Sequence, residues 1–195
     1  MTNKTKNITS FIAAFTIITV ASAFGHNPGG KPDPMNASLE SLRGAEFEQS
    51  FLQQMIQHHR SAVEMAKLVS DHTKRPELRE LGGKIITAQQ QEIDQMTKWL
   101  ADWYKTSPKE VANEAADKEM KPHMSMLSGK HDADFDKAFL DMMPKHHHAA
   151  VEMAEQAEKK ATHPELKEFA AKLAKDQEQE MKQMKEWAQA WFGPA

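Results

Sequence analysis

The sequence of 195 residues contains no cysteine. This absence excludes disulfide bonds, thiolate zinc sites, iron–sulfur clusters and thiol catalysis. Neither sign of charge is in strong excess, since 25 Lys and Arg stand against 28 Asp and Glu. A nucleic-acid partner held by phosphate contacts is therefore disfavoured. Glycine (8) and proline (9) are too few for a collagen-like or low-complexity chain.

Against these absences, the chain carries 13 Met and 10 His. Thioethers and imidazoles are the ligands that remain for soft and borderline metal ions when thiolates are missing. Methionine also fills hydrophobic cores with no further role. The positions of these residues along the chain must therefore decide between a metal site and ordinary packing.

The first 23 residues have the three parts of a secretory signal peptide. Two lysines precede an apolar run from Ile8 to Val20, and Ala21-Ser22-Ala23 is a small-residue cleavage site. The run is short for a transmembrane helix, although an uncleaved N-terminal anchor is the alternative. We predict a periplasmic or otherwise exported protein, with no stable membrane insertion after cleavage, that begins with a flexible leader over residues 24–43.

An internal repeat organises the rest of the chain. Residues 51–104 align with residues 139–192 at a constant offset of 88 and without a gap, and 22 of the 54 pairs are identical. Apolar residues recur with helical spacing in both copies, and no period-two alternation is present. The sequence predicts an all-α, four-helix bundle built from two tandem helical hairpins. The hairpins span residues 44–104 and 134–192, and a partly helical, Met/His-containing connector spans residues 105–133.

Local signals mark the ends of these helices. Pro76 and Pro164 begin the second helix of each hairpin, where the missing N–H of proline costs nothing. Asp134 is a candidate N-cap, and Thr162-x-x-Glu165 has the spacing of a capping box. The turns between the helices contain His72 and His163, which we expect to be exposed to solvent.

Helical spacing places Met and His on the faces that turn toward the bundle interior. Met55 and His59 share one stripe of the first helix, and His58 lies on its flank. Copy two repeats the pattern and adds Met142 and His148. Burying several imidazoles costs free energy unless each finds a partner, and a metal ion supplies a partner to more than one at once. We therefore expect a metal site, with core packing as the alternative.

The spacing of the ligands indicates which metal is preferred. Glu-x-x-His, which builds the hard site of di-iron bundles, is absent. Its place is taken by Met55-x-x-His58 and Met143-x-x-His146, and a thioether in place of a carboxylate favours Cu(I), with Cu(II) and Ag(I) as competitors. Inward polar residues of the second helices could orient the imidazoles from behind. These are Gln89, Glu92, Gln177 and Glu180.

The connector contains a second group of Met and His. Five such residues lie within twelve positions: Met120, His123, Met124, Met126 and His131. A flexible segment of this composition can bind Cu(I) without a preformed geometry. The alternative is a polar loop in which the methionines occur by chance.

The motif Met-x-x-His-His-x-x-Ala-x-x-Met-Ala at Met55–Ala66, followed by Gln89-x-x-Glu92-x-x-x-Met96-x-x-Trp99, resembles the DUF305 family. Copy two carries the same motifs within residues 143–187. The resemblance implies a ferritin-like bundle that binds copper through Met and His. The ligands that it implies are Met55, His58, His59, Met65, Met96, Met143, His146, His147, Met153 and Met184.

We therefore expect an exported protein that buffers, sequesters or transfers Cu(I) in copper homeostasis or resistance. Its partners would be copper ions and another exported copper carrier or transporter. No nucleophile, phosphate-loop or dinucleotide motif is present, so we do not expect an enzyme. Two alternatives remain. One is a ferritin-like oxidase or iron protein that uses Glu92 and Glu180, and the other is a metal-free helical interaction module.

Overall fold

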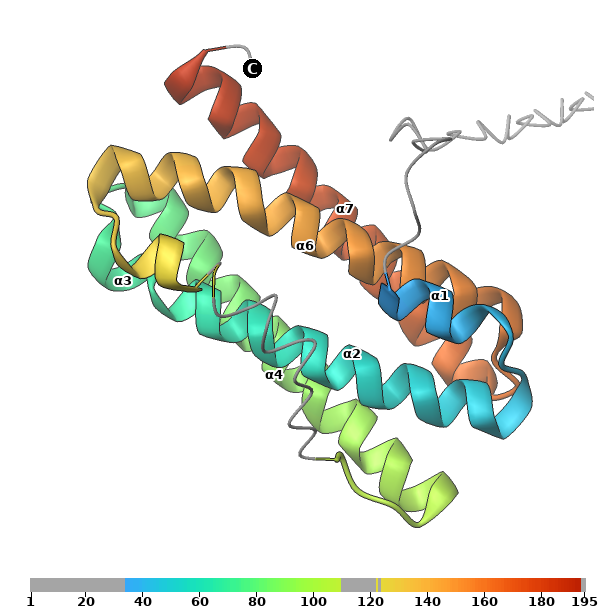
Figure 1. Ribbon diagram of the computed structural model, residues 1–195. Helices are drawn as coiled ribbons and strands as arrows, with labels where there is room; N and C mark the ends of the chain where they lie inside the picture. The colour runs from blue at the N-terminus through green and yellow to red at the C-terminus, as the bar shows by residue number, and fades with distance from the viewer. Residues whose placement is uncertain (1–33, 110–121, 123, 194–195) are drawn as a thin grey trace, which may run out of the picture. The chain divides into compact units, whose positions relative to one another are not determined.

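Two long helical hairpins make up most of the described chain (Figure 1). The computed structural model describes residues 34–109, 122 and 124–193, so the predicted signal peptide, Met120 and His123 lie outside it. The helices are α1 (Pro34–Glu40), α2 (Gly44–Lys67), α3 (Val69–His72), α4 (Pro76–Tyr104), α6 (Asp132–Lys160) and α7 (Pro164–Phe192). The described residues contain no strand, and the predicted all-α class is confirmed.

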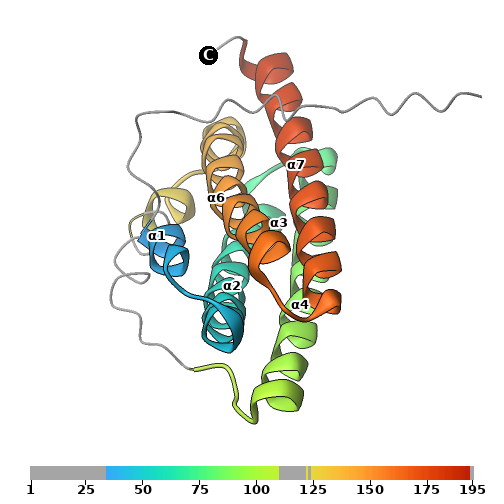
Figure 2. The ribbon, with the colours of Figure 1, turned by 90° about the vertical axis from the view of Figure 1, so that its right-hand side faces the viewer.

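Each hairpin packs its own two helices together, and the hairpins meet mainly through α2 and α6. The C-terminal turns of α4 and α7 lie at opposite ends of the bundle (Figures 1 and 2). This arrangement is that of two repeats related by a pseudo-twofold axis, as the offset of 88 predicts. The bundle of two tandem hairpins is therefore confirmed.

The hydrophobic core consists of two clusters, and each draws on both hairpins. The first contains Met55 and Met96 of one hairpin with Met153 of the other. The second contains the repeat-related residues Met143, Met184 and Met65. Because every trio combines two methionines of one repeat with one of the other, the sulfur-bearing core depends on docking of the hairpins.

Part of the predicted leader is a helix. The expectation of a flexible segment over residues 24–43 is wrong for residues 34–40, which form α1 against α6. Leu39 is completely buried in the first cluster. Lys160 Nζ donates hydrogen bonds of 3.0 Å to the carbonyl oxygens of Leu39 and Glu40, so a basic side chain satisfies the carbonyls at the C-terminal end of α1.

Two predictions of helix capping are also wrong. Helix α6 begins at Asp132, two residues before the predicted N-cap Asp134. Asp134 instead lies in the first turn, where its negative charge interacts favourably with the helix dipole. His163 is the N-cap of α7, and no side chain caps it. The hydroxyl of Thr162 donates to Glu48 Oε1 at 2.9 Å, because a buried carboxylate of another helix is the stronger acceptor.

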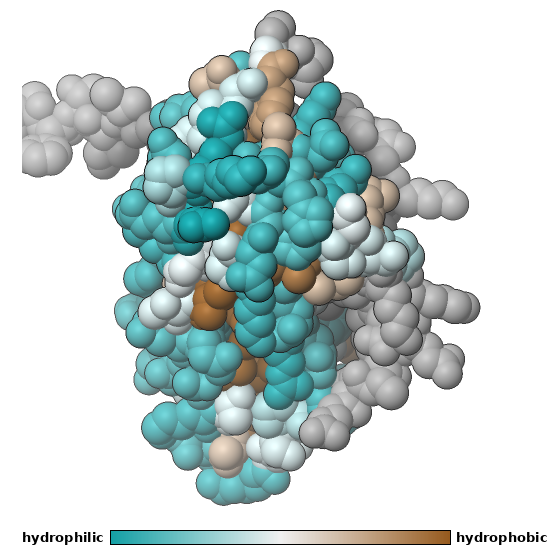
Figure 3. Space-filling view, turned by 90° about the vertical axis from the view of Figure 1, so that its left-hand side faces the viewer, coloured by the Kyte–Doolittle hydropathy of each residue, from teal (hydrophilic) through white to brown (hydrophobic). Residues whose placement is uncertain are grey.

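The surface of the described chain is polar. Figure 3 looks onto the end of the bundle where α3 lies, and hydrophilic side chains cover most of it. Among described residues, Met126 is the single large apolar side chain that is exposed, at 54%. No described helix combines the length and the apolar character needed to cross a bilayer.

Candidate metal centre

Four imidazoles meet where α2 and α6 pack against each other. The rings of His58 and His146 lie face to face across the hairpin interface, with centroids 3.7 Å apart and planes inclined by 34°. Each has its chain neighbour 6.4 Å away, which is His59 in α2 and His147 in α6. The fold thus brings together two His pairs that are 88 positions apart in the sequence.

A carboxylate holds each of the two fully buried imidazoles, His59 and His147, on the side away from Nδ1. His59 Nε2 lies 2.7 Å from Glu92 Oε2, and His147 Nε2 lies 2.7 Å from Glu180 Oε2. The carboxylates accept, so both Nε2 atoms carry a proton and a neutral ring keeps its lone pair on Nδ1. Both rings are fully buried, and neither Nδ1 has a hydrogen-bond partner among the described residues. A buried lone pair that faces no donor is suited to a metal ion.

The two rings in contact across the interface, His58 and His146, also have defined protonation states. Ser61 Oγ donates to the carbonyl oxygen of His58 at 2.7 Å, and it lies 2.7 Å from His146 Nε2. Because the hydroxyl has one proton, it accepts from His146, whose Nε2 is therefore protonated. Burial, together with the proximity of His59 and His147, lowers the pKa of His58 well below its usual range. His58 is thus neutral and can act as a ligand.

The predicted methionine ligands are all in the core beside this centre. Met55 lies one helical turn before the His pair of α2, and Met143 lies at the same position in α6. At most 1% of any of these side chains is exposed: Met55, Met65, Met96, Met143, Met153 and Met184. The structure therefore buries thioethers and unprotonated imidazole nitrogens in the interior of the same bundle.

Two glutamines line the second helices on the same inward faces. Gln89 and Gln177 are 3% and 4% exposed. Gln89 Oε1 and both side-chain polar atoms of Gln177 are buried without a hydrogen-bond partner among the described residues. Buried amides in this state destabilise a fold, so their presence in both repeats points to a role other than packing.

The additional candidate ligands lie elsewhere. Met142 and Met124 are half-buried and pack against the second cluster. His148 is exposed and lies 3.6 Å from Glu152, and the exposed His131 stacks on His72 with ring centroids 4.6 Å apart. None of these contacts involves the four central imidazoles. The structure leaves the connector site a prediction.

Hard ligands alone do not form a site in the part of the chain that is described. No three His, Asp or Glu side chains there are placed to hold one metal ion. The chain has no cysteine either, so thioether sulfur is the soft donor that the buried methionines add to the imidazoles.

A buried carboxylate cluster at one end of the bundle was not predicted. Glu48 of α2 is fully buried and accepts hydrogen bonds from Tyr104, Thr162 and His163, including His163 Nδ1 at 2.7 Å. His163 also stacks on Trp103 at 3.9 Å, and 35% of its side chain is exposed, so it is half-buried rather than the solvent-exposed turn residue that was expected. Burial alone would raise the pKa of Glu48, but the hydrogen bonds outweigh it and lower this pKa to about 2.

The opposite end carries the repeat-related cluster, in which an arginine takes the place of His163 as the donor. Asp136 of α6 accepts from Arg75 Nε at 3.0 Å, and the guanidinium lies 4.0 Å above the ring of Trp191. His72, also expected to be exposed, is half-buried and 2.6 Å from the carbonyl oxygen of Lys130. A signal for both clusters was present in the sequence, because the offset of 88 pairs Arg75 with His163 and Trp103 with Trp191.

The chain is similar to proteins of known structure, and one of these, CopM, has been solved with metals bound. CopM in its Cu(I)-bound form is 32% identical to this chain and has a TM-score of 0.66, over 75% of this chain and 98% of CopM. CopM has also been solved in apo, Cu(II)-bound and Ag-bound forms. A DUF305 protein from Streptomyces coelicolor is 26% identical, with a TM-score of 0.63, over 70% of this chain and 87% of that one.

No match was found among curated proteins. The sequence profile of the family described as "Domain of unknown function (DUF305)" matches residues 23–80 and 48–188. This match spans both hairpins and most of the chain, so the chain belongs to the DUF305 family.

Proposed function

We propose that this is an exported copper-binding protein that buffers, sequesters or hands on Cu(I). The observation that carries the proposal is the pair of buried Nδ1 atoms of His59 and His147. Because a carboxylate accepts the proton of Nε2 in each ring, each Nδ1 keeps an unshared lone pair. The ligands are drawn from the four central imidazoles and the six buried methionines around them. The Met and His of the connector provide additional, weaker binding.

Two further observations support a soft metal. The interior offers sulfur without thiolate, and thioethers prefer Cu(I) and its close chemical relative Ag(I) over harder ions. CopM, which is similar over nearly its full length, has been solved with Cu(I), Cu(II) and Ag. The role is binding and release rather than catalysis, and the acceptor is another exported carrier or transporter.

Competition with a chromophoric Cu(I) chelator under anaerobic conditions tests the proposal. The protein should withdraw Cu(I) from the chelator, and bound metal should raise the melting temperature. An ion at about 100 times its Kd adds about 2.7 kcal/mol to the free energy of unfolding. A protein that leaves all copper on the chelator at micromolar concentration contradicts the proposal, and iron in the isolated protein would favour the iron alternative.

Variants locate the metal. Replacing His58, His59, His146 and His147 by Ala should lower the copper stoichiometry while the helical circular dichroism survives. His148→Ala is the matched control, because it removes an exposed imidazole next to the centre. Unchanged uptake by the fourfold variant would move the site to the connector. The proposal of a metal-free interaction module would gain support if copper left the melting temperature of the parent protein unchanged.

A further inference from the structure

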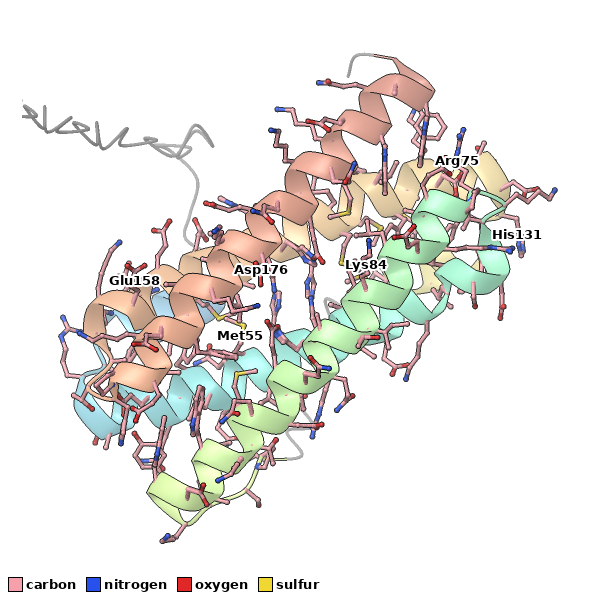
Figure 4. All side chains as sticks on the ribbon, turned by 180° about the vertical axis from the view of Figure 1, so that it is seen from behind. Met55, Arg75, Lys84, His131, Glu158 and Asp176 are labelled. Atoms are coloured by element: carbon pink, nitrogen blue, oxygen red, sulfur yellow. The ribbon has the colours of Figure 1, made fainter. Side chains whose placement is uncertain are left out.

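A groove of about 470 Å³ separates α4 from α7 on the side of the bundle away from the α2–α6 contact. Its walls include Glu77, Glu80 and Leu81 of α4 and Asp176, Glu180 and Trp187 of α7. Figure 4 labels Asp176 on α7 and Lys84 on α4, the two helices that border it. The groove is therefore a feature of the hairpin interface rather than of either hairpin alone.

One wall residue connects the groove with the buried centre. Glu180 lines the groove with 24% of its side chain exposed, while its Oε2 lies 2.7 Å from His147 Nε2. The ring of His147 behind it is fully buried, and its Nδ1 has no hydrogen-bond partner among the described residues. The Glu180 carboxylate and the imidazole ring of His147 are thus what lies between the groove and the bare Nδ1.

The charge of the groove suits a cation. Four carboxylates line it, against one lysine: Glu77, Glu80, Asp176, Glu180 and Lys84. Lys84 is paired with Glu80 at 2.6 Å and Asp176 is paired with Lys172, so the net negative charge of the groove comes from Glu77 and Glu180. Acidic walls around a recess concentrate cations and speed their arrival.

The repeat-related approach carries a larger side chain, and Glu92 there is 17% exposed against 24% for Glu180. The offset of 88 pairs Leu81 with Phe169 and Trp187 with Trp99. Phe169 stands edge-on to Trp99, with ring centroids 5.1 Å apart and planes at 86°, and both pack against the first hydrophobic cluster. Where the open groove has the smaller Leu81, the opposite side has an aromatic ring. The pseudo-symmetry of the centre is therefore broken at its two approaches.

We propose that the groove between α4 and α7 is the route by which Cu(I) or Ag(I) reaches the buried imidazoles and thioethers. Glu180 receives the cation at the inner end of this route, and Phe169 with Trp99 closes the equivalent route beside Glu92. This inference rests on the proposed function, because it presumes that the central site takes a metal ion. It adds that loading and unloading of the site are one-sided.

The proposal is tested by measuring how fast variants take up and release Cu(I) while they bind the same number of copper ions. Leu81→Phe copies the closed side into the open one, and it should slow both Cu(I) uptake and Cu(I) removal by an excess chelator about tenfold, with the same stoichiometry. Leu81→Ile is the matched control, since it keeps the volume, and should exchange at the parental rate. Phe169→Leu opens the second approach and should speed exchange.

These outcomes separate the inference from the proposed function. A parent protein that binds no copper refutes both. Full copper binding with equal exchange rates in the parent, Leu81→Phe and Phe169→Leu refutes the one-sided route alone. Circular dichroism checks that each variant folds. If Leu81→Phe is unfolded, the rate of Phe169→Leu decides, because that change removes bulk and inserts none.

Discussion

Hairpins α2–α4 and α6–α7 place identical residues at the centre of the bundle and different ones at its two ends. The central His, Glu, Gln and Met are the same in both copies. At the ends, Glu48 with His163 in one place corresponds to Asp136 with Arg75 in the other. The centre is a shared structure in which a ring from each hairpin touches the other, so a change in one copy alters both.

The ends do not touch each other. Each needs only a side chain that lies on an indole ring and donates a hydrogen bond to a buried carboxylate. His163 and Arg75 both satisfy that requirement, on Trp103 and Trp191 respectively. They differ in what else they do. Arg75 carries a permanent charge, whereas His163 also donates its backbone N–H to the carboxylate that its ring holds, Glu48 Oε1 at 2.9 Å.

The largest effect should come from removing the charge of the better-bonded carboxylate. Glu48 is fully buried and accepts from Tyr104, Thr162 and His163, so Glu48→Gln should lower the free energy of unfolding by about 3 kcal/mol. Asp136→Asn should cost about 1 kcal/mol, because its Oδ1 has no hydrogen-bond partner among the described residues, whereas both oxygens of Glu48 accept. Urea denaturation measures both.

Glu64→Gln is the control for this comparison. Glu64 occupies an exposed position of α2, where its side chain is 56% exposed, and its loss should change the free energy of unfolding by less than about 0.5 kcal/mol. Equal losses for Glu48→Gln and Asp136→Asn would contradict the difference between the two ends.

Acid should destabilise the Glu48 end selectively. The pKa of Glu48 is lowered from 4.5 to about 2 in the folded protein, so its contribution to stability is complete above the unfolded value of 4.5. That contribution is lost as the pH falls from about 4.5 toward about 2. Glu48→Gln should therefore flatten the dependence of the free energy of unfolding on pH within this window, measured by urea titrations at several pH values. An equally steep dependence in the variant would contradict the assignment.

Much of the fold was predictable because the repeat constrains it. The helix starts at Pro76 and Pro164 and the inward faces of both copies follow from spacing alone. The contact of each central Glu with a His follows too, since both lie on inward faces of paired helices. The face-to-face stack of His58 with His146 does not, because it depends on which helices of the two hairpins meet.

The errors at Thr162, His163 and Leu39 share a physical cause. Thr162 looked like a cap and His163 like an exposed turn residue because each was judged from its neighbours in sequence. In the structure both side chains donate hydrogen bonds to Glu48, which is more than a hundred positions away in the sequence. Leu39 was assigned to a flexible leader for the same reason, since nothing local shows that it is buried in the first cluster. Long-range partners overrode local signals in every case.

The buried glutamines offer a smaller effect with the opposite sign. Both polar atoms of the Gln177 side chain lack partners among the described residues, whereas for Gln89 this holds for Oε1 alone. Gln177→Leu should therefore raise the free energy of unfolding of the metal-free protein by about 1 kcal/mol, and Gln89→Leu should raise it less. Thermal unfolding in the presence of a chelator measures this, and losses of stability in both variants would contradict it.

The smallest effect concerns the one polar difference inside the centre. Ser61 corresponds to Ala149 in the second repeat, so a hydroxyl fixes the tautomer of His146 while the repeat-related position beside His58 has none. Ser61→Ala makes the two copies alike, and it should cost about 0.5–1 kcal/mol, because the half-buried His146 can exchange the hydroxyl for water. The imidazole nitrogen shifts in NMR spectra should then show that Nε2 of His146 is no longer the fixed site of its proton. Ser70→Ala, which removes an exposed hydroxyl from α3, is the control. If the two variants lose equal stability and the His146 shifts stay unchanged, the hydroxyl does not set the protonation state, and the centre is symmetric in its chemistry despite the difference between Ser61 and Ala149.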